Sequence, residues 1–387
     1  MVTVAVDAWR GVVGQDHLVD VLRQAVALDT LAHGFVLVGD AGLGQVALTR
    51  GLAAALNCPQ ATDGAGCGAC DVCDRIVRGV HPAVIEIEPD GAQHAVSDVR
   101  DVWLPAATVT MSEGRRRVIR IVDADLMNVP AQNALLKLLE EPPASVVWVL
   151  DVRRDTALLD TVLSRCHVLH MRLLDAGTLA SLATSYGIRE EHVARDVRLS
   201  GGSPARLRDL ADPDLAVLRD TAVNLLHVLH EAGPVAVFGQ MKTVVACAKD
   251  AVSRVKEENA SERARLEEAY GVEGKSGFPP GVLTRLNRTH DRKERAAQRH
   301  AILFFLAQLH SYLRDLLLVI NQVHDTHLLN RDEIARLRDD ASRLDVSDVT
   351  AAVTALGRCE DALKGNGAAE LHLERLFMVL ALSVYGK

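Results

Sequence analysis

The chain has 387 residues, more than one ordinary hydrophobic core accommodates, so two or three domains are expected. Aromatic residues make up only 3% of a composition that is 49% apolar, so the core must consist mainly of Leu, Val and Ala. The formal net charge of -8 argues against a protein that grips nucleic acid on its own, because phosphate-dominated binding requires a basic surface.

The first residues and the apolar runs also give an expectation of location. Residues 1–18 lack the charged-then-apolar layout of a signal peptide. No apolar run approaches the length of a membrane span. We therefore expect a soluble, cytoplasmic protein with no membrane among its partners.

Short apolar runs alternate with helical patterns through the first 170 residues. Apolar strands separated by helices predict an α/β fold, in which a parallel sheet is covered on both faces. Pro142 and Pro143 terminate the helical pattern that ends at Glu141. The strands are expected at residues 34–39, 83–88, 117–123, 145–151 and 167–171.

The strand pattern disappears at about residue 172, and a short helical stretch leads to the turn at 200–206. In that turn Gly201 and Gly202 interrupt the helical pattern, and Ser203 is expected to cap the next helix.

After about residue 213 every readable pattern is helical. Residues 297–320 and 372–386 carry wide apolar faces, which we expect to be buried between helices. Residues 256–297 are charged and interrupted by Gly and Pro, which predicts exposed helical ends around a loop. The simplest interpretation of the basic run within them is a solvated helix face.

Residues 36–50 have the layout of a phosphate-binding loop, in which a strand runs through glycines into a helix. The backbone N–H groups of such a loop can cradle an anion. Gln45 stands where a lysine should reach the phosphates, and Val46 stands where a hydroxyl should bind Mg²⁺. An ordinary glycine-rich turn is the alternative interpretation. The glycines are Gly39, Gly42 and Gly44.

The third apolar run ends in acidic residues, at the position where nucleotide hydrolases hold Mg²⁺ through water. Asp123 fits that role, but Ala124 occupies the place of the water-activating glutamate, and Asp125 has a shorter reach. Two solvated aspartates capping the next helix are the alternative. Because the lysine, the hydroxyl and the base are all missing, we predict no ATP hydrolysis by this chain. ATP binding should be weak or absent, so ATP should not raise the melting temperature.

A cluster of cysteines separates the loop from the second strand, and its members are Cys58, Cys67, Cys70 and Cys73. Two successive Cys-x-x-Cys spacings and a fourth cysteine nearby form the closed thiolate shell that structural Zn²⁺ prefers. An odd total of seven cysteines argues against a disulfide framework. A redox dithiol and an iron–sulfur cluster are the alternatives to zinc.

The last motif is Ser164-Arg165-Cys166, where a short helical pattern over residues 158–163 meets the fifth strand. An arginine held at the edge of a domain can reach a neighbouring subunit and stabilise transferring phosphate charge there. A surface arginine in a salt bridge is the alternative.

Taken together, these motifs resemble those of bacterial clamp-loader subunits of the AAA+ class. The resemblance covers roughly residues 8–210 and is most specific in residues 133–143, NALLKLLEEPP, and in the Ser-Arg-Cys element. It implies a RecA-like domain over 1–171 with a zinc insert at 58–73, a helical lid over 172–213, and an all-helical collar over 214–387.

The resemblance also implies roles for particular residues. Arg165 would reach into the ATP site of an adjacent motor subunit, and Ser164 and Cys166 would hold it in place. Arg206 falls where family members carry the lid arginine of the nucleotide site. Loss of the loop side chains, with the cysteines and the Ser-Arg-Cys element retained, is typical of the non-hydrolysing member of the family.

The implied partners are the gamma/tau ATPase subunits and the delta subunit of a pentameric ring. The sliding clamp and primer-template DNA would be reached through that assembly. Two alternatives remain open: an active gamma/tau-like motor subunit, and a zinc-stabilised adaptor without a role in replication.

Overall fold

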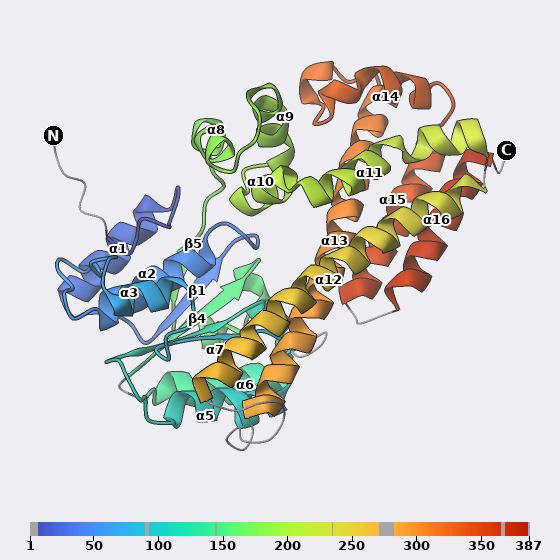
Figure 1. Cartoon of the computed structure of the whole chain (residues 1–387). Helices are drawn as coiled ribbons and strands as arrows, with labels where there is room; N and C mark the ends of the chain where they lie inside the picture. Colours follow the sequence, from blue (N-terminus) through green and yellow to red (C-terminus); the bar gives the residue numbers. More distant parts are fainter. Residues whose placement is uncertain are drawn as a thin grey trace. The chain divides into compact units, whose positions relative to one another are not determined.

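The computed structural model describes residues 7–89, 93–143, 145–233, 235–270, 282–364 and 368–385 (Figure 1). The chain divides into two compact units. The first contains Met1–Leu182 and Ser200–Leu207, and the second contains Ala183–Leu199 and Arg208–Lys387.

The first unit is built on a five-stranded sheet with strand order β2-β3-β4-β1-β5, and every neighbouring pair of strands is parallel. All five predicted strands are confirmed, because the runs rich in Val, Leu and Ile are the ones that are buried in the centre of the domain. The strands are β1 (Gly34–Val38), β2 (Val84–Ile87), β3 (Arg117–Ile121), β4 (Val146–Val152) and β5 (His167–His170).

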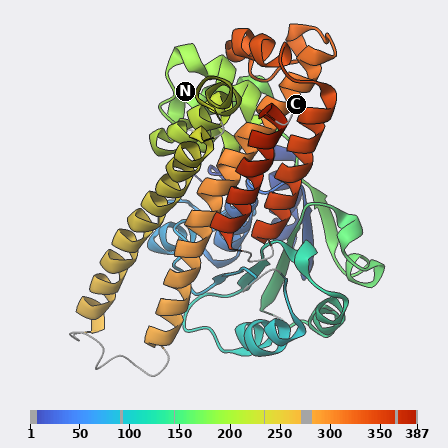
Figure 2. The ribbon, with the colours of Figure 1, turned by 90° about the vertical axis from the view of Figure 1, so that its right-hand side faces the viewer.

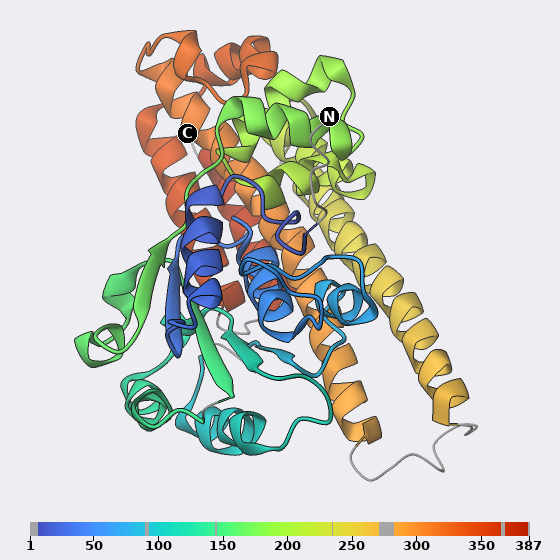
Figure 3. The ribbon, with the colours of Figure 1, turned by 90° about the vertical axis from the view of Figure 1, so that its left-hand side faces the viewer.

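Alternate residues of each strand face opposite sides of the sheet, as the period of two requires. On β1, Phe35 and Leu37 join one hydrophobic cluster, whereas Val36 and Val38 join the other. The first face is covered by α1 (Asp16–Ala27), α2 (Gln45–Asn57) and α3 (Asp71–Val77). The second face is covered by α5 (Leu104–Thr108), α6 (Val129–Glu140) and α7 (Asp160–Leu163) (Figure 3). The prediction of a sheet covered on both faces is confirmed.

Two predicted helices have different ends in the structure. Helix α6 ends at Glu140, one residue before the position expected from the two prolines. The helix predicted over residues 158–163 is shorter than expected, because α7 begins only at Asp160 and forms a single turn. Leu158 lies outside that turn and is nevertheless buried.

Three helices follow β5: α8 (Ala176–Ser185), α9 (Glu190–Ser200) and α10 (Pro204–Ala211). The division between the two compact units runs through this region, so the separate lid over 172–213 stays a prediction. Ser203 caps α10 as expected, since its Oγ accepts the backbone N–H of Arg206 at 3.3 Å.

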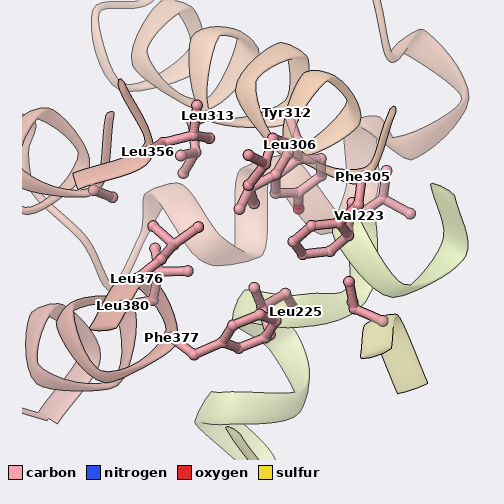
Figure 4. Packing of buried hydrophobic residues seen from close by; sticks show 14 of the residues in the cluster. Val223, Leu225, Phe305, Leu306, Tyr312, Leu313, Leu356, Leu376, Phe377 and Leu380 are labelled. Carbon is pink, nitrogen blue, oxygen red and sulfur yellow. The ribbon is translucent and has the colours of Figure 1, made fainter. Parts of the chain in front are cut away.

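In the described part of the second unit every regular element is helical. The largest helices pack around an aliphatic core that contains few aromatic side chains (Figure 4). Phe305 and Phe377 stack within it, with ring centroids 5.7 Å apart. The elements are α11 (Pro213–Ala232), α12 (Ala236–Tyr270), α13 (Val282–Ile320), α14 (Ile334–Ala341), α15 (Val346–Lys364) and α16 (Ala369–Tyr385).

The expectation that no apolar run approaches a membrane span is wrong for one helix by length and composition. Leu286–Ile320, within α13, meets both criteria, and half of its most apolar window is buried inside the protein. Leu306, Leu309 and Leu313 of this helix are fully buried in the helical core. Its apolar residues are therefore accounted for by packing between helices.

Helices α12 and α13 lie side by side and extend past the ends of α15 and α16 (Figure 2). The prediction of charged helical ends over residues 256–297 is confirmed for both helices. The loop predicted between them falls on residues 271–281, outside the described residues. We call the part of this pair that projects beyond the core, residues 252–270 and 282–300, the arm.

Candidate functional site

The glycine-rich loop connects β1 to α2 at the carboxyl edge of the sheet. Gly42 and Gly44 have φ values of 86° and 110°, which only glycine adopts without strain. A Cβ atom on Gly42 would lie 2.3 Å from the Cβ of Ala205. The loop is therefore packed so closely that a side chain at Gly42 has no room.

Gln45, the residue in the place of the lysine, folds back into the loop. Its side-chain carbonyl accepts the Leu43 backbone N–H at 3.0 Å, and its amide donates to the Asp40 backbone carbonyl at 2.7 Å. Gln45 is 3% exposed. The side chain thus satisfies a backbone donor of the kind that holds phosphate in an intact loop.

A second buried amide, which sequence reasoning did not single out, ties this loop to the end of β5. Gln15 is fully buried, and its amide donates to the backbone carbonyls of Leu43 at 3.2 Å and Arg172 at 2.7 Å. Its carbonyl accepts the Arg172 N–H at 3.0 Å. The only sequence signal was a polar residue in an otherwise apolar segment before α1.

The acidic residues after β3 do not cap the next helix, contrary to the alternative interpretation. Asn128 caps α6 by accepting the Ala131 N–H at 2.9 Å. Asp123 has a φ of 49°, and burial raises the pKa of Asp125. Between them the buried Ala124 offers no base, as expected from the sequence.

Below the loop, ion pairs join α2 to three strands, and sequence reasoning missed them. Arg50 of α2 lies 3.1 Å from Glu86 of β2, whose other oxygen lies 3.4 Å from Arg120 of β3. Arg120 also donates from Nε to Asp151 of β4 at 2.8 Å. Burial raises the pKa of Asp151 to about 6, although Arg120 opposes this. These pairs hold the loop helix to the sheet without any nucleotide.

The four cysteines converge, as their spacing predicted. The sulfur atoms of Cys58, Cys67, Cys70 and Cys73 all lie within 4.8 Å of one another. A tetrahedral zinc site with Zn–S bonds of about 2.3 Å requires sulfurs about 3.8 Å apart. The Sγ atoms of Cys58 and Cys70 are 3.8 Å apart. The cluster could therefore hold a metal ion.

Backbone N–H groups surround these sulfurs. Cys58 Sγ accepts from Gln60 at 3.3 Å and from Cys67 at 3.4 Å, and Cys70 Sγ accepts from Cys73 at 3.5 Å. Such donors stabilise thiolates. A backbone hydrogen bond from Ala69 lowers the pKa of Cys67 to about 6, whereas burial raises the pKa values of Cys70 and Cys73. The donor set fits a metal ion that is bound by four thiolates, such as Zn²⁺.

Arg165 lies between α7 and β5, and 36% of its side chain is exposed. It donates to Glu140 at the end of α6 at 2.6 Å and to the Thr161 backbone carbonyl at 2.9 Å. A salt bridge was the alternative interpretation of this arginine, and Glu140 was not identified as its partner from the sequence. The signal was present in the two glutamates of LLEEPP.

The two neighbours of Arg165 contact its surroundings differently. Ser164 Oγ accepts from the Arg165 guanidinium at 3.4 Å and donates to the Thr161 carbonyl at 3.1 Å. Cys166 packs beneath the start of β1, and burial raises its pKa to about 11. Cys166 is thus a packing residue rather than a reactive thiolate.

Arg206, the expected lid arginine, is exposed in the first turn of α10. Its backbone N–H bonds to Ser203, and among the described residues no side-chain hydrogen bond joins it to the loop. The structure therefore brings the loop residues together around Gln45 and leaves Arg206 outside that group.

Comparison with known proteins identifies relatives for the first unit. Residues 14–175 match the family model described as DNA polymerase III, delta subunit. DNA polymerase III subunit tau of Salmonella typhimurium is 34% identical over 202 residues, which are 51% of this chain and 31% of that protein. DNA polymerase III subunit delta' of Pseudomonas aeruginosa is 39% identical over 137 residues, 35% of this chain and 42% of that protein.

The chain thus spans less than half the length of these relatives. Among solved structures, a gamma subunit-related protein of DNA polymerase III from Thermotoga maritima is similar over 94% of this chain and 98% of that chain. The identity is 14% and the TM-score is 0.45.

Proposed function

We propose that this chain belongs to the clamp-loader AAA+ family, which the similarity of its first unit supports, and that within this family it is the delta-prime subunit of the bacterial DNA polymerase III holoenzyme. In this role it does not hydrolyse ATP. It is a stator that completes the ATP site of a neighbouring gamma/tau subunit while the ring, with the delta subunit, loads the sliding clamp onto primed DNA. It works in the cytoplasm, at the nucleoid-associated replisome.

The observation that carries this proposal is the position of Gln45. The side chain occupies the loop, accepts the Leu43 N–H and is almost fully buried. A motor subunit needs a cationic side chain there to stabilise the charge that develops on the transferring phosphate. Val46 offers no ligand for Mg²⁺. The loop therefore keeps the backbone shape of a phosphate-binding loop but lacks the side chains that ATP hydrolysis needs.

In this proposal Arg165 is the residue of this chain that takes part in ATP hydrolysis, at the site of a neighbouring subunit. Its guanidinium is partly exposed, and its salt bridge to Glu140 is between half-exposed partners. Exposed pairs of this kind contribute about 0–1 kcal/mol, so a neighbour's phosphate competes readily for the arginine. Ser164 is a positioning residue for the guanidinium, and Cys166 anchors the segment to β1.

The four cysteines hold a structural Zn²⁺ in this proposal. When bound, the ion supplies no catalysis, because all four ligand positions are filled by protein. Its effect is to fix the insert between α2 and α3. The three-domain division into residues 1–171, 172–213 and 214–387, with the last as the collar, belongs to the same proposal.

The test is ATP turnover by a reconstituted ring with clamp and primed DNA, comparing wild type with Arg165→Ala. We expect the neighbouring site to lose about 10³-fold or more in turnover, the effect typical of an arginine supplied in trans. Arg78→Ala is the matched control, because Arg78 is also exposed and also pairs with a carboxylate, Asp74. It should leave turnover unchanged.

The isolated chain is the blank, and millimolar ATP should leave its melting temperature unchanged. Hydrolysis by the isolated chain would identify it as a gamma/tau-like motor, an alternative that the tau relative favours. A ring that assembles and is indifferent to Arg165→Ala would remove the role given to the arginine. A chain that joins no ring would be a zinc-stabilised adaptor.

A further inference from the structure

Glu140, the last residue of α6, is the acidic partner of Arg165, and sequence reasoning gave it no role. Its Oε1 accepts from Arg165 Nη2 at 2.6 Å, and the two side chains are 47% and 36% exposed. An ion pair of this exposure contributes little to the stability of the fold. The two elements that carry the pair, however, are fixed to each other by buried contacts.

The first of these contacts joins α6 to the segment that leads into α7. Gln132 of α6 is almost fully buried. Its amide donates to the Ala157 carbonyl at 3.2 Å, and its side-chain carbonyl accepts the Leu159 N–H at 2.7 Å. Because a buried polar group that loses its partners is costly, these bonds fix residues 157–159 against α6.

The second contact involves the neighbours of the pair in sequence. Leu139 precedes Glu140, and Cys166 follows the arginine. Both neighbours pack at Gly34, the first residue of β1, where an added Cβ atom would lie 2.8 Å from Cys166 Sγ and 3.2 Å from Leu139 Cδ2. The core therefore sets the distance between the backbones of Glu140 and Arg165. What the ion pair adds is the orientation of the side chains.

The place of Glu140 is unfavourable for the helix that carries it. The backbone carbonyl groups at the C-terminal end of a helix carry partial negative charge, so a carboxylate there is destabilising and a cation is stabilising. Helix α6 ends at Glu140, and Glu141 follows as its C-cap. Sequence positions that break a local rule in this way are typical of functional sites. The guanidinium of Arg165 offsets the charge of Glu140.

The guanidinium keeps donors free after these contacts. Arg165 Nη1 donates to the Thr161 carbonyl at 2.9 Å and to Ser164 Oγ at 3.4 Å, and Nη2 donates to Glu140. A guanidinium has five N–H groups. Among the described residues, the Nε–H and the second Nη2 N–H of Arg165 therefore have no acceptor. These two groups are available to a phosphate, the anion that the planar fork of arginine suits.

We propose that Glu140 is a further positioning residue for ATP hydrolysis at the neighbouring subunit, an inference that rests on the proposed function of Arg165 and deepens it. The carboxylate orders the guanidinium before the phosphate arrives, and the two free N–H groups meet the phosphate first. The exposed pair is weak, so it does not retain the arginine afterwards. An ordered arginine loses less rotamer freedom in the transition state, so Glu140 acts on the rate through Arg165 and not by contact with ATP.

The test is turnover by the reconstituted ring with clamp and primed DNA, measured over a range of ATP concentrations. Glu140→Ala should lower kcat at the neighbouring site roughly 2- to 10-fold, the cost of ordering one long side chain, and leave KM nearly unchanged. Glu140→Gln keeps an oxygen acceptor for Arg165 Nη2 and should restore most of the rate.

Glu141→Ala is the matched control for this comparison. Glu141 is the next residue and is exposed, and within the described ranges of the chain no ion pair joins it. Its removal should leave kcat at the wild-type value. An equal fall in kcat for Glu140→Ala and Glu141→Ala would contradict the inference, because charge at the end of α6 would then explain both.

A double variant shows whether Glu140 acts through the arginine. Glu140→Ala combined with Arg165→Ala should be as slow as Arg165→Ala alone, since a positioning residue has no effect once its partner is gone. If the double variant is slower than Arg165→Ala by the full factor that Glu140→Ala causes alone, Glu140 supports the structure and not the arginine, and the inference is wrong.

A second readout follows Arg165 in the isolated chain. NMR relaxation of the arginine Nε–H groups reports how ordered each one is, and the signal that is missing in Arg165→Ala identifies this arginine. Glu140→Ala should lower its order parameter, Glu140→Gln should lower it less, and Glu141→Ala should leave it unchanged. An order parameter that Glu140→Ala leaves at the wild-type value would overturn the inference.

Failure of this inference and failure of the proposed function are distinguishable. Turnover that is indifferent to Arg165→Ala removes the role of the arginine in the ring, and the role of Glu140 with it. Turnover that depends on Arg165 but is equal in wild type and Glu140→Ala removes only the role given to Glu140. Circular dichroism of each variant checks that these exposed substitutions preserve the helices.

Discussion

Gln45 and Arg165 show how single side chains divide the chemistry of this chain. Gln45 is long enough to reach both a donor and an acceptor of its own loop, so the loop is complete without an anion. Arg165 is held by one half-exposed carboxylate and one backbone carbonyl, so it can be released at little cost. The first residue fills its own loop, and the second remains partly exposed, as its proposed role toward a neighbouring subunit requires.

The closed loop predicts the effect of restoring the missing cation. Gln45→Lys removes the acceptor of the buried Leu43 N–H and introduces a buried ammonium group, so the free energy of unfolding should fall by about 1–3 kcal/mol. Gln45→Glu is the complementary variant, because it keeps an acceptor for Leu43 but removes the donor to the Asp40 carbonyl, and it should also be less stable than wild type. Chemical denaturation of the three proteins gives both values. Equal stability of wild type and Gln45→Lys would show that the amide contacts do not stabilise the loop.

His94 predicts a pH dependence. It is fully buried, hydrogen-bonded to the Val122 carbonyl at 2.8 Å and packed edge-on against Trp103. Burial lowers its pKa below the ordinary 6.5, although Asp98, Asp123 and Asp125 oppose this. Below pH 6.5 the unfolded chain therefore binds a proton that the folded chain does not, and stability falls as the pH falls.

His94→Gln isolates this contribution, because glutamine keeps a donor for Val122 and does not titrate. The free energy of unfolding of wild type relative to this variant should be constant above pH 7. It should decrease between pH 6.5 and 5, by at most about 1.4 kcal/mol per pH unit. Parallel denaturation curves at each pH provide the measurement. A constant difference down to pH 5 would mean that folding leaves the pKa of His94 unchanged.

The elements differ in how far the sequence predicts them. The three central strands β1, β3 and β4 were the most predictable, because each is an apolar run that is buried between two layers of helices. The edge strands β2 and β5 are only partly buried, and His167 and His170 of β5 are exposed. Helix α7 was predicted too long, because the apolar residue Leu158 is buried without being helical. In both cases the pattern of apolar residues correctly predicts which side chains are buried. It predicts the backbone conformation only when the run is long enough to show the period of a helix or a strand.

The cysteine insert is an element whose stability should depend on its metal. The segment before α1 is joined to it, because the indole N–H of Trp9 donates to the Gly64 carbonyl at 3.2 Å and Ala8 donates to the Gly66 carbonyl at 3.0 Å. Purified protein should contain about one zinc per chain. Cys67→Ser should lower zinc content and melting temperature and change the emission of Trp9.

Cys247→Ser is the control for this experiment, since Cys247 is half-buried in α12 and far along the chain from the cluster. It should retain a full complement of zinc, as measured by mass spectrometry of the metal. Protein that lacks zinc in both wild type and control would exclude a structural zinc site. Iron and acid-labile sulfide in its place would favour a cluster.

At the scale of the whole chain, the site was predictable where its residues are neighbours in sequence and not where they are distant. The glycines, the cysteines and the Ser-Arg-Cys element each lie within one short segment. The contacts of Gln15 with Arg172 and of Glu140 with Arg165 join residues 157 and 25 positions apart. Such pairs are decided by strand order, which no local pattern contains. The tie between α2 and the sheet through Glu86 belongs to the same class.

Helix α6 joins two of these features, and its length sets the distance between them. Asn128 caps one end beside the acidic residues of β3, and Glu140 holds Arg165 at the other. Its 12 residues form a rod about 18 Å long. If the loop does not respond to nucleotide, as we propose, then no nucleotide-driven change within this chain is expected to shorten, tilt or release this rod. In the proposed ring, Arg165 would therefore keep its position within this chain. The extent of ring opening would be set by how far the neighbouring subunit moves relative to Arg165.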